Sequence, residues 1–157
     1  MKRQGPEKRI LCAEDDPDDR LLLTEAFNES GCVAALDFVS DGEEALDYLF
    51  RRGKYAKFGQ ASLPRLILLD LNMPRKNGFE VLREVKSNRR LRSIPVVVLS
   101  TSTAEADIQS VYDMWVNSFI IKPGRFDSLV NIMHLLVKYW LEVVELPDSI
   151  VGDKNGE

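Results

Sequence analysis

The sequence predicts an α/β fold in which five parallel strands form one doubly wound sheet with helices on both faces. Short apolar runs alternate with longer amphipathic segments five times along the chain, without an internal repeat. Such alternation is typical of βα units, whose helices return the chain for the next parallel strand. Residues 66–69 are apolar at consecutive positions, as expected for a strand that is covered on both faces.

The expected strands are the short apolar runs, because each is followed by polar or turn-forming residues. The run at residues 95–99 is the most apolar of them. The strands are expected at residues 9–13, 36–39, 66–69, 95–99 and 119–121.

The expected helices follow the strands, where apolar residues recur at helical spacing. The first begins at Asp16 and Pro17, because Asp can cap a helix and Pro suits its first turn, and it stops at Gly31. Ser102 or Thr103 is expected to cap the fourth helix. The others are expected at residues 43–50, after Gly78, and at residues 126–145.

Composition indicates an ordinary soluble globular protein with one domain. Of the 157 residues, 45% are hydrophobic, and 21 basic against 25 acidic residues give a net charge of −4. This acidic balance argues against nucleic acid as the main partner. Two cysteines are too few for a disulfide framework, and neither a signal peptide nor a membrane-spanning run is present. The expected location is therefore the cytoplasm, with no membrane partner.

Residues able to do chemistry follow four of the five expected strands. Glu14 and Asp15 follow the first strand, Asp70 the third, Ser100 the fourth and Lys122 the fifth. In parallel sheets the reactive site lies beyond the carboxyl ends of the strands, so we expect these side chains to meet there.

Three carboxylates in one pocket would raise one another's pKa, and a hard divalent cation resolves that conflict. Ligands that are all oxygen favour Mg²⁺, and the absence of His and Cys at these strand ends argues against zinc. Asp70 is then a candidate nucleophile for a phosphoryl group. The metal, the Lys122 ammonium and the Ser100 hydroxyl would share the charge of the phosphoryl oxygens.

Each residue also has a simpler explanation. Asp15 or Asp16 could serve as a helix cap, and Asp70 could form a turn before Pro74. Lys122 alone would more often be a surface lysine. The joint placement of these residues at four strand ends is what favours a site.

These residues fall in four motifs that resemble the receiver domains of two-component response regulators, the class to which chemotaxis regulators belong. The resemblance covers about residues 8–145, and it implies a flavodoxin-like sheet of strand order 2-1-3-4-5. The motifs are residues 10–17, residues 68–74 with Gly78, residues 97–101 and residues 119–123.

The resemblance implies a role for each acidic residue. Asp70 is similar to the phosphoacceptor of the family, and Asp15 to a direct Mg²⁺ ligand. Glu14 would hold a metal-bound water, and the backbone carbonyl of Asn72 would be the third protein ligand.

The same resemblance gives roles to the later motifs. Lys122 would pair with Asp70 and then with the phosphoryl group, and its bond to Pro123 would be cis. Ser100 and Phe119 would form the switch pair that moves on phosphorylation. The family takes its phosphoryl group from a histidine of a sensor kinase. The chain is therefore expected to be a signalling domain and not an enzyme, beyond self-catalysed phosphotransfer and dephosphorylation.

Within the family, the sequence is most similar to single-domain regulators of bacterial phytochrome kinases. This narrower resemblance rests on a long polar connection at residues 52–63, the run at residues 99–103 and the ending at residues 139–147. The chain departs from the commonest pattern at Thr101 and Trp115, where small residues are usual, and at Gly124, where an aromatic is common.

Three alternatives compete with this interpretation at particular residues. A small Mg²⁺-dependent phosphatase with an aspartyl nucleophile would usually carry a second acid two residues after Asp70, where this chain has Asn72. His134 could be a phosphodonor, but a helix-surface role is favoured. The basic and aromatic residues at 51–58 could bind nucleic acid, but a solvated loop is favoured.

The expected receiver domain spans residues 8–147, between an N-terminal tail at 1–7 and a disordered C-terminal tail at 148–157. That tail is too short for an output domain, so output is expected through protein contacts. The final helix is apolar over more than one face, which predicts a homodimer through it unless the core and tail cover it. Its apolar residues are Leu129, Val130, Ile132, Met133, Leu136, Val137, Trp140, Leu141 and Val144.

Overall fold

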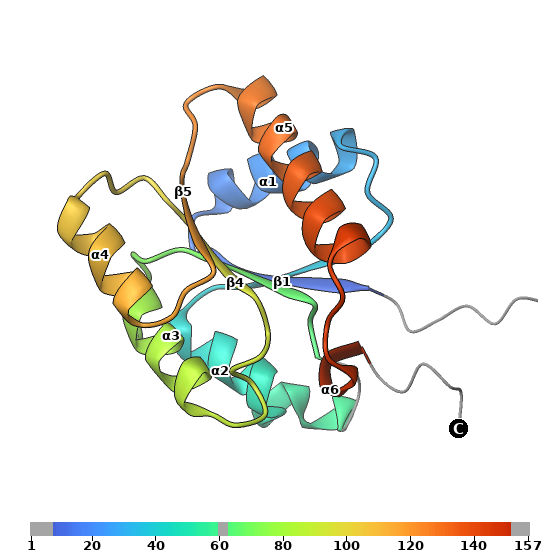
Figure 1. Cartoon of the computed structure of the whole chain (residues 1–157), viewed down its shortest axis with the longest axis vertical. Coiled ribbons are helices and arrows are strands. Elements are labelled where there is room, and N and C mark those ends of the chain that lie inside the picture. The colour runs from blue at the N-terminus through green and yellow to red at the C-terminus, as the bar shows by residue number, and fades with distance from the viewer. Residues whose placement is uncertain (1–7, 60–62, 152–157) are drawn as a thin grey trace, which may run out of the picture.

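The computed structural model describes residues 8–59 and 63–151, and it confirms the predicted sheet (Figure 1). Five parallel strands form one sheet in the order β2-β1-β3-β4-β5. The strands are β1 (Arg9–Ala13), β2 (Ala35–Val39), β3 (Leu66–Leu69), β4 (Val96–Ser100) and β5 (Ser118–Ile121).

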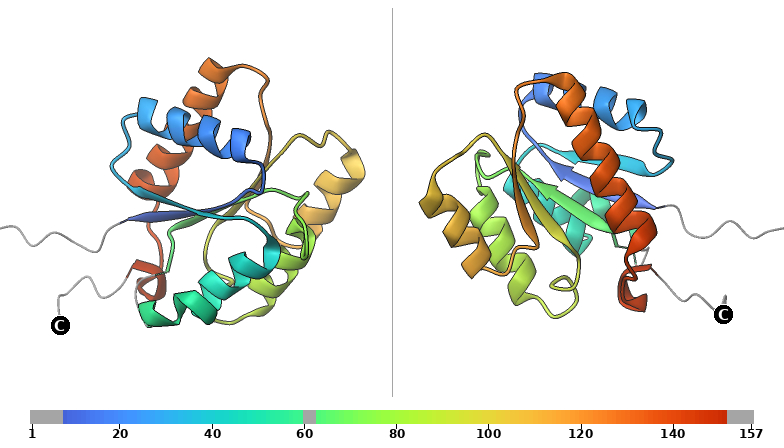
Figure 2. Two further views of the ribbon diagram at one scale, coloured as in Figure 1. Left: turned by 180° about the vertical axis from the view of Figure 1, so that it is seen from behind. Right: turned by 45° about the horizontal axis from the view of Figure 1, so that its top comes forward.

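Helices cover both faces of the sheet, as Figures 1 and 2 show. On one face lie α1 (Pro17–Glu29) and α5 (Phe126–Val137), and α5 continues into a π-helical segment, η2 (Lys138–Val143). On the other face lie α2 (Gly42–Phe50), α3 (Gly78–Ser87) and α4 (Glu105–Asp113). Each face of the sheet therefore has its own apolar core.

The first helix begins and ends where the sequence predicts. The Asp16 carboxylate accepts hydrogen bonds from the backbone N–H groups of Asp18 and Asp19 at 2.8 and 3.2 Å, and Pro17 is in the first turn. Beyond the end of the helix, Gly31 adopts a φ of 77°, which favours glycine. Local capping chemistry thus fixes the boundaries of α1.

The predicted cap of α4 is wrong, because Ala104 occupies the N-cap position and makes no side-chain cap. Ser102 lies two residues earlier, and its hydroxyl accepts from the Ala104 N–H at 3.3 Å and donates to Asp107 at 2.7 Å. The hydroxyl therefore stabilises the turn that leads into the helix.

Residues 52–63 are not simply a polar connection. A 3₁₀-helix, η1 (Gly53–Phe58), occupies the first half of this segment, and the Tyr55 hydroxyl anchors it by donating to Glu44 at 2.9 Å. Residues 60–62 lie outside the described part of the chain.

The C-terminal tail is predicted to be disordered from residue 148, and this is wrong for its first four residues. Asp148–Val151 form a short helix, α6, in which the Pro147 carbonyl accepts from the Ile150 N–H at 2.9 Å. Ile150 is 0% exposed and joins the core that faces α2 and α3. The chain thus crosses from the face covered by α5 to the face covered by α2 and α3, where the apolar side chains of Ile150 and Val151 are buried. The predicted tails at 1–7 and 152–157 lie outside the described residues.

In the described part of the chain, no helix is long and apolar enough to span a lipid bilayer.

Replacing Ile150 tests whether α6 belongs to the folded domain. We expect Ile150→Ala to lower the free energy of unfolding by about 2–5 kcal/mol, because it leaves a cavity at a fully buried position. Urea unfolding followed by circular dichroism measures the change. The neighbouring exposed Ser149→Ala should stay within about 0.5 kcal/mol, and an equally small loss for Ile150→Ala would contradict the burial of α6.

Candidate functional site

The predicted site residues meet at the carboxyl ends of the strands, because the parallel ladders place those ends side by side. The Asp70 N–H donates to the Ala13 carbonyl at 3.1 Å, which sets Asp70 beside the residues that follow β1. The Lys122 N–H donates to the Ser100 carbonyl at 2.8 Å, which brings the last two strand ends together. All four predicted strand ends therefore contribute to one site.

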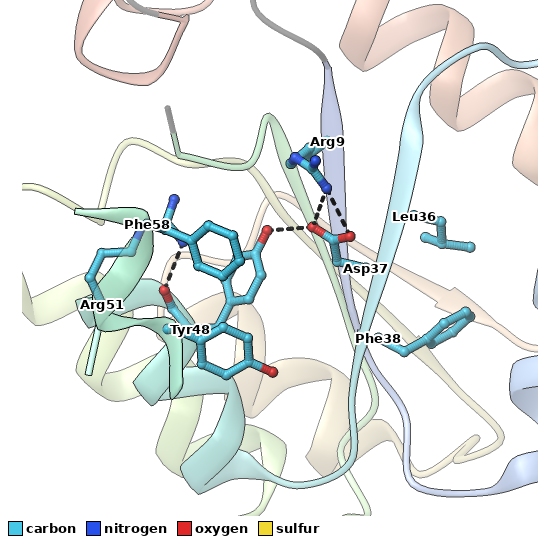
Figure 3. Close-up of a pocket in the computed structure, with 8 residues that line it drawn as sticks. Arg9, Leu36, Asp37, Phe38, Tyr48, Arg51 and Phe58 are labelled. Atoms are coloured by element: carbon cyan, nitrogen blue, oxygen red, sulfur yellow. Dashed lines mark hydrogen bonds and ion pairs between the residues drawn. The ribbon is translucent and has the colours of Figure 1, made fainter. Parts of the chain in front are cut away.

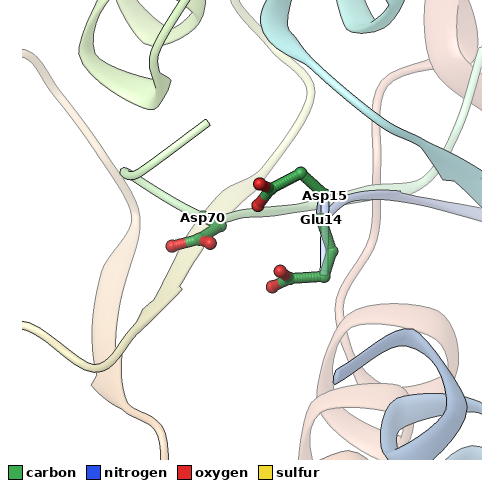
Figure 4. Close-up of side chains that lie close together, drawn as sticks. All are labelled: Glu14, Asp15 and Asp70. Carbon is green, nitrogen blue, oxygen red and sulfur yellow. The ribbon is translucent and has the colours of Figure 1, made fainter. Parts of the chain in front are cut away.

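Three carboxylates gather at its centre, as Figure 4 shows. Carboxylate oxygens of Glu14, Asp15 and Asp70 all lie within 4.8 Å of one another. Glu14 is 2% exposed and Asp70 is 9% exposed, whereas Asp15 is open to solvent. A cluster of hard oxygen donors with one solvent-facing member fits a divalent cation that keeps some of its water.

Lys122 is the cation that the fold itself supplies to this cluster. Its Nζ donates to Glu14 at 2.6 Å and to Asp19 at 3.3 Å, and it lies 3.9 Å from an oxygen of Asp70. The expected pairing with Asp70 is therefore the longest of the three contacts. Each of the two buried carboxylates also accepts from a backbone N–H, Glu14 from Asp16 at 3.1 Å and Asp70 from Asn72 at 3.3 Å.

Asp19 was missed by the sequence reasoning. It lies in the first turn of α1, and only the orientation of that helix brings its carboxylate to Lys122. Arg20, next to it, donates to the Glu14 carbonyl at 2.7 Å and so fixes the start of α1 against the site. The signal available in the sequence was the run of four Asp residues at 15, 16, 18 and 19.

Burial dominates the acid–base properties of the cluster. Burial raises the pKa of Glu14 and of Asp70 above the ordinary carboxyl range, although Lys122 acts in the opposite direction. Burial alone would lower the pKa of Lys122, but its hydrogen bond to Glu14 and the charges of Asp70, Glu14 and Asp19 raise it overall. One lysine thus faces more than one buried carboxylate, and the excess negative charge favours a bound cation.

The loop after β3 is shaped by a close backbone approach. A Cβ at Gly78 would collide with the carbonyl oxygen of Asp70 and the Cα of Leu71, and the Gly78 N–H donates to the Leu71 carbonyl at 3.0 Å. Glycine therefore lets α3 begin directly against the strand end that carries Asp70. Asn72 is exposed in the same loop.

The last two motifs place the expected switch residues and correct one prediction. Ser100 is fully buried, and its Oγ accepts from the Ser102 N–H at 3.1 Å. Phe119 is half-buried, and its N–H donates to the Tyr112 hydroxyl at 3.2 Å.

The bond between Lys122 and Pro123 is trans, so the cis bond implied by the resemblance is wrong. The trans form is also the one that an X-Pro bond favours when tertiary contacts do not select cis.

The raised carboxyl pKa values predict an unusual pH dependence of stability without metal. A carboxyl group with a raised pKa binds its proton more tightly in the folded than in the unfolded state. Its contribution to the free energy of unfolding therefore falls as pH rises from about 4 through the raised pKa. We expect Asp70→Asn to be more stable than the wild type at pH 7 in EDTA, and the difference to shrink towards pH 4.

Urea unfolding at several pH values measures this difference. The exposed neighbour Asp18→Asn is the matched control and should not gain stability. A loss of stability at pH 7 in Asp70→Asn would contradict the electrostatic conflict described above.

Comparison with known proteins places the chain in a family. The model of the response regulator receiver domain matches residues 10–134. A probable methanogenesis regulatory protein, FilR2 of Methanothrix harundinacea, is 42% identical over 132 residues, which cover 84% of this chain and 83% of that protein. The response regulator Rcp1 of Synechocystis is 39% identical over 143 residues, 91% of this chain and 95% of that protein.

Solved structures show the same similarity. The phosphorylated cyanobacterial phytochrome response regulator RcpA is 45% identical, with a TM-score of 0.82 over 90% of this chain and 99% of that one. The Mn²⁺-bound form of Rcp1 is 39% identical, with a TM-score of 0.79 over 89% of this chain and 99% of that one. The family inferred from the four motifs is confirmed, and the chain belongs to the response regulator receiver domains.

Proposed function

We propose that Asp70 accepts a phosphoryl group from a histidine of a sensor kinase, in the presence of Mg²⁺, and that the chain signals through the resulting change. The observation that supports this most is the buried Asp70 carboxylate, which shares a cluster with two further carboxylates and lies 3.9 Å from Lys122. Rcp1 was solved with Mn²⁺ and RcpA in a phosphorylated form, which favours the same chemistry here.

The chain's own residues divide the work of phosphoryl transfer. Asp70 Oδ would attack the phosphorus as the bond to the histidine nitrogen breaks, so that an aspartyl phosphate replaces a phosphohistidine. Asp15, Asp70 and the Asn72 carbonyl would hold Mg²⁺, with Glu14 orienting a metal-bound water. When bound, Mg²⁺ supplies positive charge for the phosphoryl oxygens.

Lys122 and Ser100 would complete the charge balance. Lys122 Nζ would leave Glu14, now 2.6 Å away, and approach the phosphoryl group on Asp70. The buried Ser100 hydroxyl would turn from the Ser102 N–H towards a phosphoryl oxygen, and Phe119 would follow into the space released. The result is a shift between two packings of one fold.

A surface next to the site suits the kinase. A hollow of about 190 Å³ lies between α1 and the segment after β5, and Lys122 and Thr101 are part of its wall. Leu22 in the same wall is 43% exposed, and Leu21 beside it is 58% exposed. Rcp1 is a response regulator similar to this chain, and RcpA is described as a phytochrome response regulator. We therefore propose a phytochrome-type kinase as the phosphoryl donor.

The phosphatase alternative is not favoured. Asn72 stands where a general acid is needed and cannot protonate a leaving group. In the structure its backbone N–H is engaged with the Asp70 carboxylate at 3.3 Å.

A homodimer through the C-terminal helix remains a proposal, with a different contact surface. Five of the nine apolar residues expected in the interface are buried in the chain's own core: Leu129, Met133, Leu136, Val137 and Leu141. The exposed large apolar side chains of α5 and η2 are instead Phe126, Leu135, Tyr139 and Val143. Leu135 and Tyr139 border an apolar hollow of about 430 Å³ between α5 and β5, the free strand at this end of the sheet. An open strand edge beside apolar side chains is a surface that a second copy can cover.

Phosphorylation by acetyl phosphate tests the proposed acceptor. With Mg²⁺ present, we expect a single acid-stable, base-labile phosphorylation in the intact-mass spectrum, lost in Asp70→Asn and in EDTA. Asp18→Asn is the control and should be labelled like the wild type. Labelling that persists in Asp70→Asn, or rapid repeated turnover of phosphate esters, would contradict the proposal.

Charge substitutions on α5 and η2 test the proposed dimer. We expect Leu135→Glu combined with Tyr139→Glu to weaken dimerisation at least tenfold in sedimentation velocity, because both carboxylates would enter the apolar contact. His134→Glu, exposed on a different face of the same helix, should leave the dimer intact. A wild-type chain that stays monomeric at high concentration, phosphorylated or not, would rule the dimer out.

A further inference from the structure

A third hollow lies at the opposite end of the sheet from β5, beside the free strand β2 (Figure 3). We call it the edge hollow, and it encloses about 460 Å³. Neither the phosphoacceptor cluster nor the proposed dimer surface shares any of its lining residues, which are Arg9, Leu36, Asp37, Phe38, Tyr48, Arg51, Tyr55 and Phe58.

One wall of the edge hollow is the free backbone edge of β2. The Ala35 N–H donates to Lys8 at 2.8 Å and the Val39 carbonyl accepts from Glu14 at 3.0 Å, so these residues bond towards β1. Because successive residues of a strand point to opposite sides, the backbone groups of Leu36 and Phe38 face outward. Among the described strands none pairs with this edge. Such an edge can accept one more strand.

The facing wall is aromatic and carries a cation. The Tyr48 and Tyr55 rings pack edge to face at 5.1 Å, and Tyr55 and Phe58 stack at 6.1 Å. The Arg51 guanidinium lies over both Tyr48 and Phe58, at 5.1 and 5.8 Å from the ring centres. Phe58 is nevertheless 45% exposed, so this ordered wall presents apolar surface to solvent.

The charge around the edge hollow is opposite to that of the whole chain. Residues 51–59 carry four basic side chains and no acid, whereas the chain has a net charge of −4. The one carboxylate in the lining, Asp37, is already engaged by Arg9 at 3.0 Å through both oxygens and by the Tyr48 hydroxyl at 2.6 Å. Negative charge on a ligand would therefore be attracted here.

We propose that the edge hollow binds an extended acidic peptide segment of a partner protein. The segment pairs with β2 as a sixth strand through Leu36 and Phe38, sets an acidic side chain near Arg51 and rests an apolar one against Phe58. A second copy of the chain is disfavoured, because it would bring the same basic residues to the contact. Nucleic acid is disfavoured because the free edge of β2 pairs with a peptide backbone, for which a phosphate backbone has no matching groups. Glu44 and Asp47 lie 3.4 and 3.6 Å from Lys54 and Arg52, so the positive charge suits a few acidic side chains better than a row of phosphates.

A phage-display selection tests the proposal without a prior choice of peptide sequence. Random eight-residue peptides on phage are selected on the full chain and counter-selected on Arg51→Asn combined with Phe58→Ala. Asn tolerates the φ of 56° at position 51, and Phe58 is half-exposed, so the variant should fold. Its unchanged labelling at Asp70 by acetyl phosphate checks this, and that check stands apart from peptide binding.

We expect enriched peptides with at least two acids around an apolar residue, bound at least tenfold more weakly by the variant in fluorescence anisotropy. N-methylation of alternate peptide amides should abolish binding in one register and spare it in the other, since every second amide faces β2. No preference for the wild type, basic peptides, or indifference to N-methylation would overturn the proposal. The amide resonances of Leu36 and Phe38 in NMR spectra report on the edge hollow. If oligothymidylate or AMP shifts them and the selected peptides do not, the ligand of the hollow is a nucleotide and the proposal is wrong.

Discussion

The crowding of carboxylates at the end of β1 and β3 is the constraint on which the rest of this structure depends. Glu14 and Asp70 are held almost out of water by strands whose pairing leaves them no freedom to separate. Lys122 approaches Glu14 most closely and leaves Asp70 at 3.9 Å, so the lysine is shared unequally. In the proposed function, a bound cation or phosphoryl group would change that division. Because Asp19 of α1 also contacts Lys122, a change at Asp70 reaches a helix surface directly.

The sequence was sufficient to predict the sheet, because each strand is defined by its own few residues. Buried runs of consecutive apolar residues occur in a covered parallel sheet, and the polar residues after them must then meet at one edge. The capping of α1 by Asp16 is equally local. The resemblance to the family supplied the expected roles of the site residues. The structure brings these residues together at one site.

The features that could not be predicted depend on contacts between distant segments. The partnership of Asp19 with Lys122 depends on how α1 packs, and the state of the bond before Pro123 depends on the surrounding loop. Ile150 and Val151 are two apolar residues in a polar stretch, too few to show a period. On the final helix, the covered apolar face depends on how α5 packs against the sheet and α1, and it places Leu129, Met133, Leu136 and Val137 in the core.

The two free edges of the sheet are chemically different, and this difference bears on their roles. Natural proteins often place lysine beside an edge strand to prevent aggregation, and the basic residues of η1 could be explained in this way alone. Protection requires charge near the edge and no exposed apolar surface. The β2 edge instead faces stacked Tyr55 and Phe58 rings, with Phe58 45% exposed and a guanidinium ordered over it. An edge that served only to prevent aggregation would not present apolar surface there. The arrangement therefore fits recognition of an acidic segment better than protection against aggregation.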